Sequence, residues 1–314
     1  MIKLKKPDFW DYKKPNFLSY ILLPFTFPFI LNNFFLGFKE NKNLYKKIKK
    51  ICIGNIYVGG TAKTPLTIKI YQILDNLNFK SATIKKFYKD QIDEQKILSA
   101  KTKLYCFKKR KTALREAIKD NIDVAIFDDG LQDHSINYDL KFVCFNNIKC
   151  IGNGFLMPAG PLREKIESMS KYDAAFINGN ERDNSYLKLL IKKYNKNAQI
   201  FESHYKVTNI DQLDLNEKYV VFSGIGNPES FIETLRRNKL NIIKEINFPD
   251  HYKYTQNDID KIKIKAKNLN AKILTTEKDY IKIDLNKNDD IKFLKIELDI
   301  KDMEKLVKYL KLNI

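Results

Sequence analysis

The stretch Ile51–Pro65, ICIGNIYVGGTAKTP, constrains the fold of this 314-residue chain more than any other. Its apolar start over residues 51–56 is typical of a buried strand, and Gly59-Gly60 can turn the chain. The apolar residues that follow have the spacing of one helix face: Leu66, Ile70, Ile73, Leu74 and Leu77. A strand, a glycine turn and a helix start predict a phosphate site, because backbone N–H groups meet an anion there. Lys63 would add a positive charge, and the hydroxyl of Thr64 can hold Mg²⁺.

The loop departs from the general phosphate-loop pattern G-x-x-x-x-G-K-[ST] at both flanking glycines. Tyr57 stands at the first of these positions and Ala62 at the last. The pattern alone is therefore equally compatible with an ordinary junction between a strand and a helix, and the rest of the chain has to decide.

The charge of the chain permits several kinds of partner. The formal net charge of +19 could serve nucleic acid, an anionic membrane surface or a phosphorylated substrate. Much of the excess is lysine scattered among asparagine and isoleucine, which is typical of a compositional bias and not of a binding face. An apolar content of 44% excludes a largely disordered protein. The four cysteines have no C-x-x-C spacing, which favours buried thiols over a metal site.

Residues 17–38 contain no charged side chain and approach the length of a membrane span, which is about 20 residues. Pro24, Pro28 and Asn32-Asn33 interrupt this window, and lysines flank both ends. We interpret it as a helical segment that lies on, or dips into, the membrane interface. The alternative is a buried N-terminal helix of the globular core.

Strands and helices alternate along the remaining chain, which predicts an α/β fold with mostly parallel sheets and helices on both faces. Residues 85–103 are polar, with Asp90, Asp93 and Glu94 close together, and a strand is expected at about 291–298. The strand that begins at Ile122 ends in Asp128-Asp129-Gly130. Because ligands bind at the carboxyl ends of strands in such sheets, either aspartate could hold Mg²⁺. A simple Asp-Gly turn is the alternative.

Several ordered motifs resemble those of the tetraacyldisaccharide 4'-kinase family, the membrane-associated lipid A 4'-kinases. The resemblance covers almost the whole chain. It rests on the segments Gly54–Pro65, Asp128–Gln132, Gly152–Gly154 with Pro158–Glu164, Gly224–Pro228, Phe248–His251 and Thr275–Asp279.

The resemblance implies an enzyme that moves the γ-phosphoryl group of ATP to the 4'-hydroxyl of an acylated glucosamine disaccharide 1-phosphate. ATP and Mg²⁺ would be the cofactors. The phosphate loop would bind ATP through Asn55, Val58, Gly59, Gly60, Thr61, Ala62, Lys63, Thr64 and Pro65. Thr64 with Asp128 and Asp129 would hold the metal, and the sequence does not say which aspartate binds it directly. Asp93 would be the catalytic base, supported by His251, with Lys63 on the β- and γ-phosphates.

The chain also departs from the family pattern. Ala62 replaces a glycine, which costs about 1 kcal/mol if the position needs a positive φ and nothing if it is helical. The glycine and proline of the family's G-D-E-P segment are Ile92 and Gln95 here, and a histidine of the family is Asp133, followed by His134. Arg163 and Glu164 stand where the family expects them, either ordering the active-site loops or forming a surface pair that opens a helix.

Together these patterns predict a P-loop kinase-like core within two α/β/α domains. We expect an N-terminal membrane-associated segment at 1–40, a nucleotide-binding domain at 41–205, and a second domain at 206–314 that closes the active-site cleft. The expected partners are the lipid substrate and the inner membrane surface, with no nucleic acid and no obligate protein partner. The expected location is the cytoplasmic face of the bacterial inner membrane, where the protein is peripheral or anchored by residues 17–38. A kinase or synthetase for a soluble metabolite and a basic nucleic-acid-binding ATPase are the competing hypotheses.

Overall fold

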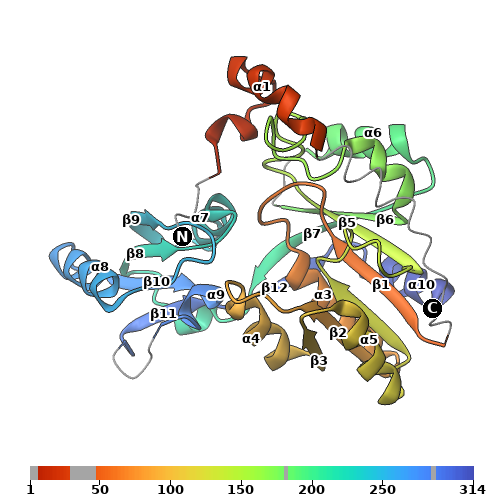
Figure 1. Cartoon of the computed structure of the whole chain (residues 1–314). Coiled ribbons are helices and arrows are strands. Elements are labelled where there is room, and N and C mark those ends of the chain that lie inside the picture. Colours follow the sequence, from red (N-terminus) through yellow and green to blue (C-terminus); the bar gives the residue numbers. More distant parts are fainter. Residues whose placement is uncertain (1–5, 29–46, 180–182, 284–287) are drawn as a thin grey trace. The chain divides into compact units, whose positions relative to one another are not determined.

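The structure, a computed structural model, describes residues 6–28, 47–179, 183–283 and 288–314. The chain divides into two compact units (Figure 1). The larger unit contains the described residues up to Phe87 together with Lys101–His204 and Ile300–Ile314, and the smaller unit contains Tyr88–Ala100 and Tyr205–Asp299. Each unit has its own sheet with helices packed on it, so the α/β fold class predicted from the sequence is confirmed.

The larger sheet has eight strands in the order β12-β7-β6-β5-β1-β4-β2-β3. The seven strands from β7 to β3 pair in parallel. The strands of this sheet are β1 (Lys49–Gly54), β2 (Ser81–Lys86), β3 (Leu104–Phe107), β4 (Val124–Asp128), β5 (Leu140–Asn146), β6 (Ala174–Asn178), β7 (Gln199–Val207) and β12 (Ile296–Ile300). After β1 the chain builds outward through β2 and β3, and after β4 it builds in the other direction through β5, β6 and β7. Ligands bind at such a reversal of strand order in open α/β sheets.

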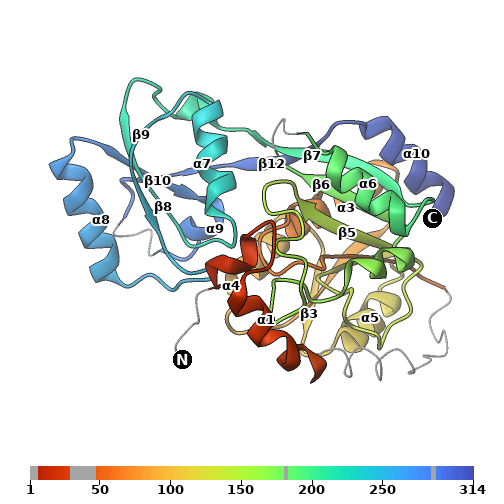
Figure 2. The same cartoon turned by 90° about the horizontal axis from the view of Figure 1, so that it is seen from above.

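Helices cover both faces of this sheet (Figures 1 and 2). Buried residues of α5 (Arg110–Lys119) and α6 (Ser185–Tyr194) share one apolar cluster with alternate residues of β1, β4 and β5. On the other face lie α3 (Lys63–Asn76) and α10 (Met303–Asn313), where Tyr309 contacts the rings of Phe142 and Phe201. A 3-10 helix, η3 (Ile166–Lys171), precedes β6.

The smaller unit has a parallel sheet in the order β11-β10-β8-β9. Its strands are β8 (Lys218–Ser223), β9 (Asn241–Asn247), β10 (Lys272–Thr276) and β11 (Ile291–Leu294). Its helices are α4 (Ile92–Lys101), η4 (Ile210–Gln212), α7 (Pro228–Arg237), α8 (Gln256–Asn268) and α9 (Glu277–Tyr280). Tyr219 and Val221 of β8 pack with α7, whereas Val220 and Phe222 pack with α8, so the two helices cover opposite faces.

The local structure differs from the sequence expectations in two places. The polar segment 85–103, for which no helix was predicted, contains α4 at Ile92–Lys101. The strand expected over 291–298 is two strands that belong to different sheets, β11 and β12. They separate at Lys295, whose N–H donates to Asn209 Oδ1 and whose carbonyl accepts from Thr208. These bonds take Lys295 out of either ladder. The domain boundaries expected from the sequence stay a prediction.

The N-terminal part of the larger unit consists of η1 (Asp8–Asp11), α1 (Phe17–Leu22) and η2 (Leu23–Thr26). Asn16 and Ser19 form a capping box that starts α1, and Pro24 lies in the 3-10 turn that follows it. Among the described residues, no helix has both the length and the apolar character needed to cross a membrane. Residues 29–38 of the predicted membrane segment lie outside the described residues.

Candidate active site

The phosphate loop lies between the end of β1 and the start of α3. Asn55 holds it from inside, because its side-chain N–H groups donate to the carbonyl of Gly59 at 3.3 Å and to Thr61 Oγ1 at 3.0 Å. Gly59 has a φ of +138°, which L side chains rarely adopt. Val58 donates its N–H to the carbonyl of Pro161. The predicted loop is therefore a built turn that leads directly into the N-terminus of α3.

Ala62 is the residue immediately before α3, and it has φ +67° and ψ +25°. This is the left-handed region, so the position needs a positive φ and is not helical. An L-residue in that region costs roughly 1–2 kcal/mol. The carbonyl of Ala62 nevertheless accepts the first helical hydrogen bond, from Leu66, at 3.0 Å. The turn required at this point is kept in spite of the added methyl group.

Asp128 ends β4 directly beside the phosphate loop. Its strand pairs with β1 so that Asp128 is in register with Ile53, and on the other side it is in register with Lys85 of β2. The carboxylate is fully buried. Its Oδ2 accepts hydrogen bonds from Lys85 Nζ at 2.6 Å and from Thr64 Oγ1 at 3.3 Å. Its Oδ1 accepts one from Thr67 Oγ1 at 3.3 Å.

Thr64 and Asp128 thus place a hydroxyl oxygen and a carboxylate oxygen 3.3 Å apart at the end of the phosphate loop. Hard oxygen donors of this kind suit Mg²⁺, which usually keeps several waters and takes its remaining ligands from carboxylates and substrate phosphates. The residues therefore fit the metal that a phosphoryl-transfer site requires.

Asp129 lies next in the chain but faces different partners. Its φ of +53° is left-handed, and its Oδ1 is 3.0 Å from Arg163 Nη1 and 3.8 Å from Lys63 Nζ. Lys63 and Asp129 are 15% and 23% exposed, which leaves both in contact with solvent. The two aspartates are thus distinct: Asp128 is buried beside Thr64, and Asp129 lies beside the partly exposed cations of Lys63 and Arg163.

The loop from Gly152 to Glu164 packs onto the phosphate loop. The N–H of Arg163 donates to the carbonyl of Ile56 at 2.7 Å, and Leu162 forms an antiparallel bridge with Tyr57. Glu164 is buried and accepts hydrogen bonds from Gln132 Nε2 at 2.7 Å and from the Tyr172 hydroxyl at 2.8 Å. Arg163 and Glu164 therefore do not form a simple surface pair. Arg163 pairs with Asp129, and Glu164 accepts a hydrogen bond from Gln132; both partners follow β4 in the chain.

Arg110 was not among the residues predicted for the site. It is 6% exposed at the start of α5, and its Nη2 donates to the carbonyl of Asp129 at 2.5 Å. Its Nη1 lies 3.2 Å from Asp133, the residue that replaces a family histidine. Burial raises the pKa of Asp133, but hydrogen bonds from Ser135 and the charge of Arg110 outweigh it and hold that pKa below its usual value. Asp133 is therefore the ion-pair partner of Arg110. His134, the next residue, is partly buried.

Tyr57 also has a role that the sequence did not reveal. Its hydroxyl donates to Asp11 and accepts from Lys6 Nζ at 2.6 Å. Nearby, Trp10 Nε1 donates to the carbonyl of Pro158 at 3.0 Å, and Asn153 donates to Ser19 Oγ at 3.0 Å. These bonds hold the N-terminal elements against the phosphate loop and the loop that packs on it.

The smaller unit brings Asp93 and His251 together. Asp93 lies in the first turn of α4 and is 4% exposed. His251 Nδ1 lies 3.0 Å from Asp93 Oδ1 and 3.1 Å from Oδ2. Asp93 and His251 are 158 positions apart in the sequence, and the fold brings them into contact. His251 has a left-handed φ of +56°, and its N–H is bonded to the carbonyl of Gly224. Strained backbone of this kind is concentrated at functional sites.

Two lysines that the sequence analysis missed surround this pair. Lys278 Nζ lies 3.2 Å from Glu94 Oε1, 3.8 Å from Asp93 Oδ2 and 3.4 Å from His251 Nε2. Lys282 Nζ lies 3.5 Å from Asp93 Oδ2 and 2.7 Å from Asp279 Oδ1. Lys278 belongs to the quoted segment Thr275–Asp279, which was the available signal.

These contacts decide the charge state of Asp93. Burial raises its pKa, but the hydrogen bond from His251 and the charges of Lys278, His251 and Lys282 outweigh burial and hold the pKa of Asp93 below its usual value. Burial lowers the pKa of Lys278, and Glu94, Asp250 and Asp93 together raise it above its usual value. Asp93 is therefore ionised and Lys278 protonated at neutral pH.

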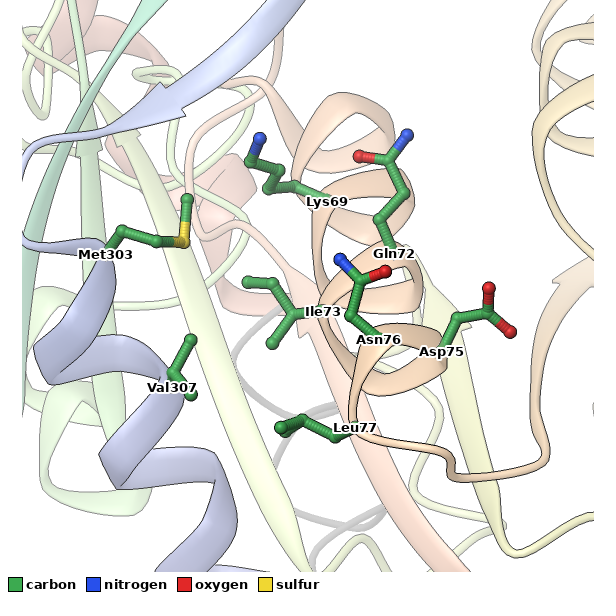
Figure 3. A pocket seen from close by; sticks show the side chains of 8 residues that line it. All are labelled: Lys69, Gln72, Ile73, Asp75, Asn76, Leu77, Met303 and Val307. Atoms are coloured by element: carbon green, nitrogen blue, oxygen red, sulfur yellow. The ribbon is translucent and has the colours of Figure 1, made fainter.

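A cavity of about 590 Å³ lies on the α3 face of the larger sheet, where Ile73 and Leu77 point toward Met303 and Val307 of α10 (Figure 3). None of the residues predicted for the site lines it. The cavity is lined by the C-terminal half of α3, whereas Lys63 lies at the N-terminus of this helix.

The chain is similar to known proteins over nearly its whole length. The model of the family Tetraacyldisaccharide-1-P 4'-kinase matches residues 22–314. The chain is 51% identical to a tetraacyldisaccharide 4'-kinase of Pelagibacter ubique (strain HTCC1062), over 99% of both chains. It is 34% identical to one of Rickettsia bellii (strain OSU 85-389), over 96% of both.

Among solved structures, the fold is similar to LpxK from Aquifex aeolicus, a crystal structure described as a complex with ATP. The TM-score is 0.67 at 21% identity, covering 94% of this chain and 99% of the other. Fold, family model and relatives agree over nearly the whole length, and the chain belongs to the tetraacyldisaccharide 4'-kinase family.

Proposed function

We propose that this protein uses ATP and Mg²⁺ to phosphorylate the 4'-hydroxyl of a tetraacylated glucosamine disaccharide 1-phosphate, which gives lipid IVA in lipid A biosynthesis. Family membership over residues 22–314 supports the reaction. The single structural observation that carries it is the pairing of β1 with β4, which aligns Ile53 with Asp128. This register puts the phosphate loop and the aspartates at neighbouring strand ends.

In this proposal the larger unit binds the nucleotide. Backbone N–H groups of residues 59–64 and the ammonium group of Lys63 would receive the β- and γ-phosphates. Thr64 and Asp128 would hold Mg²⁺, which supplies positive charge to the phosphoryl group as it transfers. Arg163 would place its guanidinium group on the same phosphates, because it shares Asp129 with Lys63.

The smaller unit would receive the proton of the attacking sugar hydroxyl. Asp93 is ionised at neutral pH, which lets it accept a hydrogen bond from the acceptor. Its low pKa makes it a weak base, but a loose phosphoryl-transfer transition state places little demand on basicity until the new bond forms. Because His251 Nδ1 contacts both oxygens of Asp93, we assign it the role of orienting the carboxylate.

We also propose that the N-terminal elements attach the protein to the inner membrane from the cytoplasmic side. Phe17, Phe25 and Phe27 are 79%, 63% and 59% exposed, an unusual density of exposed aromatic rings for one short segment. Lys13 and Lys14 are also exposed beside them. Aromatic side chains with flanking lysines favour an interfacial position on anionic lipid. A lipid substrate would then reach the site without leaving the bilayer surface.

Transfer of label from [γ-³²P]ATP tests the proposal directly. The acceptors are an acylated disaccharide 1-phosphate in mixed micelles and the same disaccharide without acyl chains. A separate reaction measures whether nucleic acid stimulates ATP hydrolysis. Label is expected in the acylated acceptor, on the 4' oxygen. Label in the soluble disaccharide but not in the acylated one, or hydrolysis that depends on nucleic acid without any lipid product, would contradict the proposal.

A further inference from the structure

Asp128, the aspartate assigned to Mg²⁺, forms an ion pair with a lysine of the same sheet, Lys85. Lys85 Nζ lies 2.6 Å from Asp128 Oδ2, and the two side chains are 2% and 0% exposed. The contact is built into the sheet, because Lys85 and Asp128 are register partners on the parallel strands β2 and β4. Neighbouring strands lie about 4.8 Å apart, which is close enough for side chains of register partners to meet without any loop rearrangement.

Two further hydrogen bonds reach this carboxylate, which leaves one of its roughly four acceptor sites for a metal. Thr64 Oγ1 donates to Oδ2, and Thr67 Oγ1 donates to Oδ1, both at 3.3 Å. A fully buried carboxylate without a nearby positive charge is costly and strongly destabilising. In the metal-free protein, Lys85 provides that charge, while the two threonines provide hydrogen bonds.

We propose that Lys85 is a positioning residue that acts as the internal counter-ion of Asp128, holding it in place before Mg²⁺–ATP binds and weakening its hold on the metal. Lys85 and Mg²⁺ are both cations and share the same carboxylate, so each lowers the affinity of Asp128 for the other. This inference rests on the assignment of Asp128 to the metal in the proposed function. It goes beyond that assignment by naming a residue that sets the metal affinity.

The chain provides a matched control. Lys50 of β1 is another lysine that is 2% exposed, and its Nζ lies 2.7 Å from Asp139 Oδ2. It belongs to the same sheet, and its partner Asp139, which is 31% exposed, lies outside the phosphate loop. Loss of Lys50 therefore reports the effect of removing a buried, ion-paired lysine from this sheet, whereas loss of Lys85 adds the effect on the metal ligand.

The experiment measures binding of Mn²⁺, a spectroscopic substitute for Mg²⁺, by electron paramagnetic resonance in the presence of a non-hydrolysable ATP analogue. Lys85→Met is expected to bind Mn²⁺ more tightly than wild type, by roughly tenfold or more, because repulsion by a nearby unit charge is removed. Lys85→Arg, which keeps the charge, and Lys50→Met are expected to bind Mn²⁺ like wild type. If Lys85→Met does not fold, Lys85→Gln takes its place, because glutamine keeps a hydrogen-bond donor but has no charge. Lys85→Gln is also expected to bind Mn²⁺ more tightly than wild type.

A second measurement follows thermal unfolding without and with the Mg²⁺–analogue complex. Lys85→Met is expected to have a lower Tm than wild type without metal, and a larger rise in Tm on adding the complex, because the metal then supplies the missing counter-ion. Unchanged Mn²⁺ affinity in both Lys85→Met and Lys85→Gln would overturn the proposal. Neither readout needs phosphoryl transfer, so a protein that binds the metal as expected but does not phosphorylate the lipid would refute the proposed function and leave this inference standing.

Discussion

Ala62 provides a sharp test of how the phosphate loop is built. Its φ of +67° is one that glycine adopts freely and that an L-residue adopts at a cost of roughly 1–2 kcal/mol. The change Ala62→Gly removes this strain. It also takes the methyl group from a buried residue, 7% exposed, and increases the freedom of the unfolded chain, which costs about 0.4–1 kcal/mol. The net change in unfolding free energy is therefore expected to be close to zero.

The strain becomes measurable against a second alanine of the larger unit. Ala113 is fully buried within the helix α5, so Ala113→Gly loses a methyl group and gains chain freedom without relieving any strain. Urea unfolding of both variants, followed by circular dichroism, isolates the difference. We expect Ala62→Gly to be more stable than Ala113→Gly by at least about 1 kcal/mol, or about 2–4 °C in Tm for a unit of this size. Equal losses of stability in the two variants would refute the reasoning that Ala62 is strained.

Three other expectations follow from the geometry. Lys63→Ala should abolish transfer and weaken binding of an ATP analogue at least tenfold, with an unchanged circular dichroism spectrum; undiminished transfer would remove Lys63 from the site. Because the pKa of folded Asp93 lies below 3.8, the stability that it contributes is full above about pH 4 and is lost as the pH falls through the lowered pKa. Unfolding free energies from pH 6 to pH 2.5 should therefore fall more steeply for wild type than for Asp93→Asn, and parallel curves would contradict this. Replacing Phe17 and Phe25 together by serine should reduce co-sedimentation with anionic phospholipid vesicles several-fold without lowering Tm, whereas full retention would place the membrane contact elsewhere.

Much of the larger unit could be predicted from sequence because its strands are buried runs and α3 has clear apolar periodicity. α4 could not, since Asp93 and Leu98 are its buried residues and its position depends on contacts with residues far along the chain. β9 could not be predicted for a related reason: most of its residues are exposed, so its sequence lacks the apolar pattern of a buried strand. In α8, by contrast, the spacing of Ile259, Ile262 and Ala266 could have predicted a helix.

The residues of the site divide in the same way. The phosphate loop and the aspartates after β4 carried a local signal, whereas the roles of Asp93 and His251 came from the family resemblance. Lys278 stood within the quoted segment Thr275–Asp279, but Lys85 and Arg110 carried no signal that could be separated from the background, because 57 lysines and arginines are spread through the chain. Only burial and pairing with a particular carboxylate distinguish Lys85 and Arg110, and both depend on the folded structure.

The central claim is that the larger unit binds the nucleotide while Asp93 of the smaller unit accepts the proton of the sugar hydroxyl. The most direct test compares two properties of Asp93→Asn with wild type: affinity for an ATP analogue, and the rate of label transfer from ATP to the acylated disaccharide 1-phosphate. Loss of a general base costs about 10²–10⁴-fold. We therefore expect transfer to fall by at least a hundredfold while nucleotide affinity stays within about threefold of wild type. Transfer at the wild-type rate would contradict the claim, and so would a loss of nucleotide affinity as large as the loss of rate.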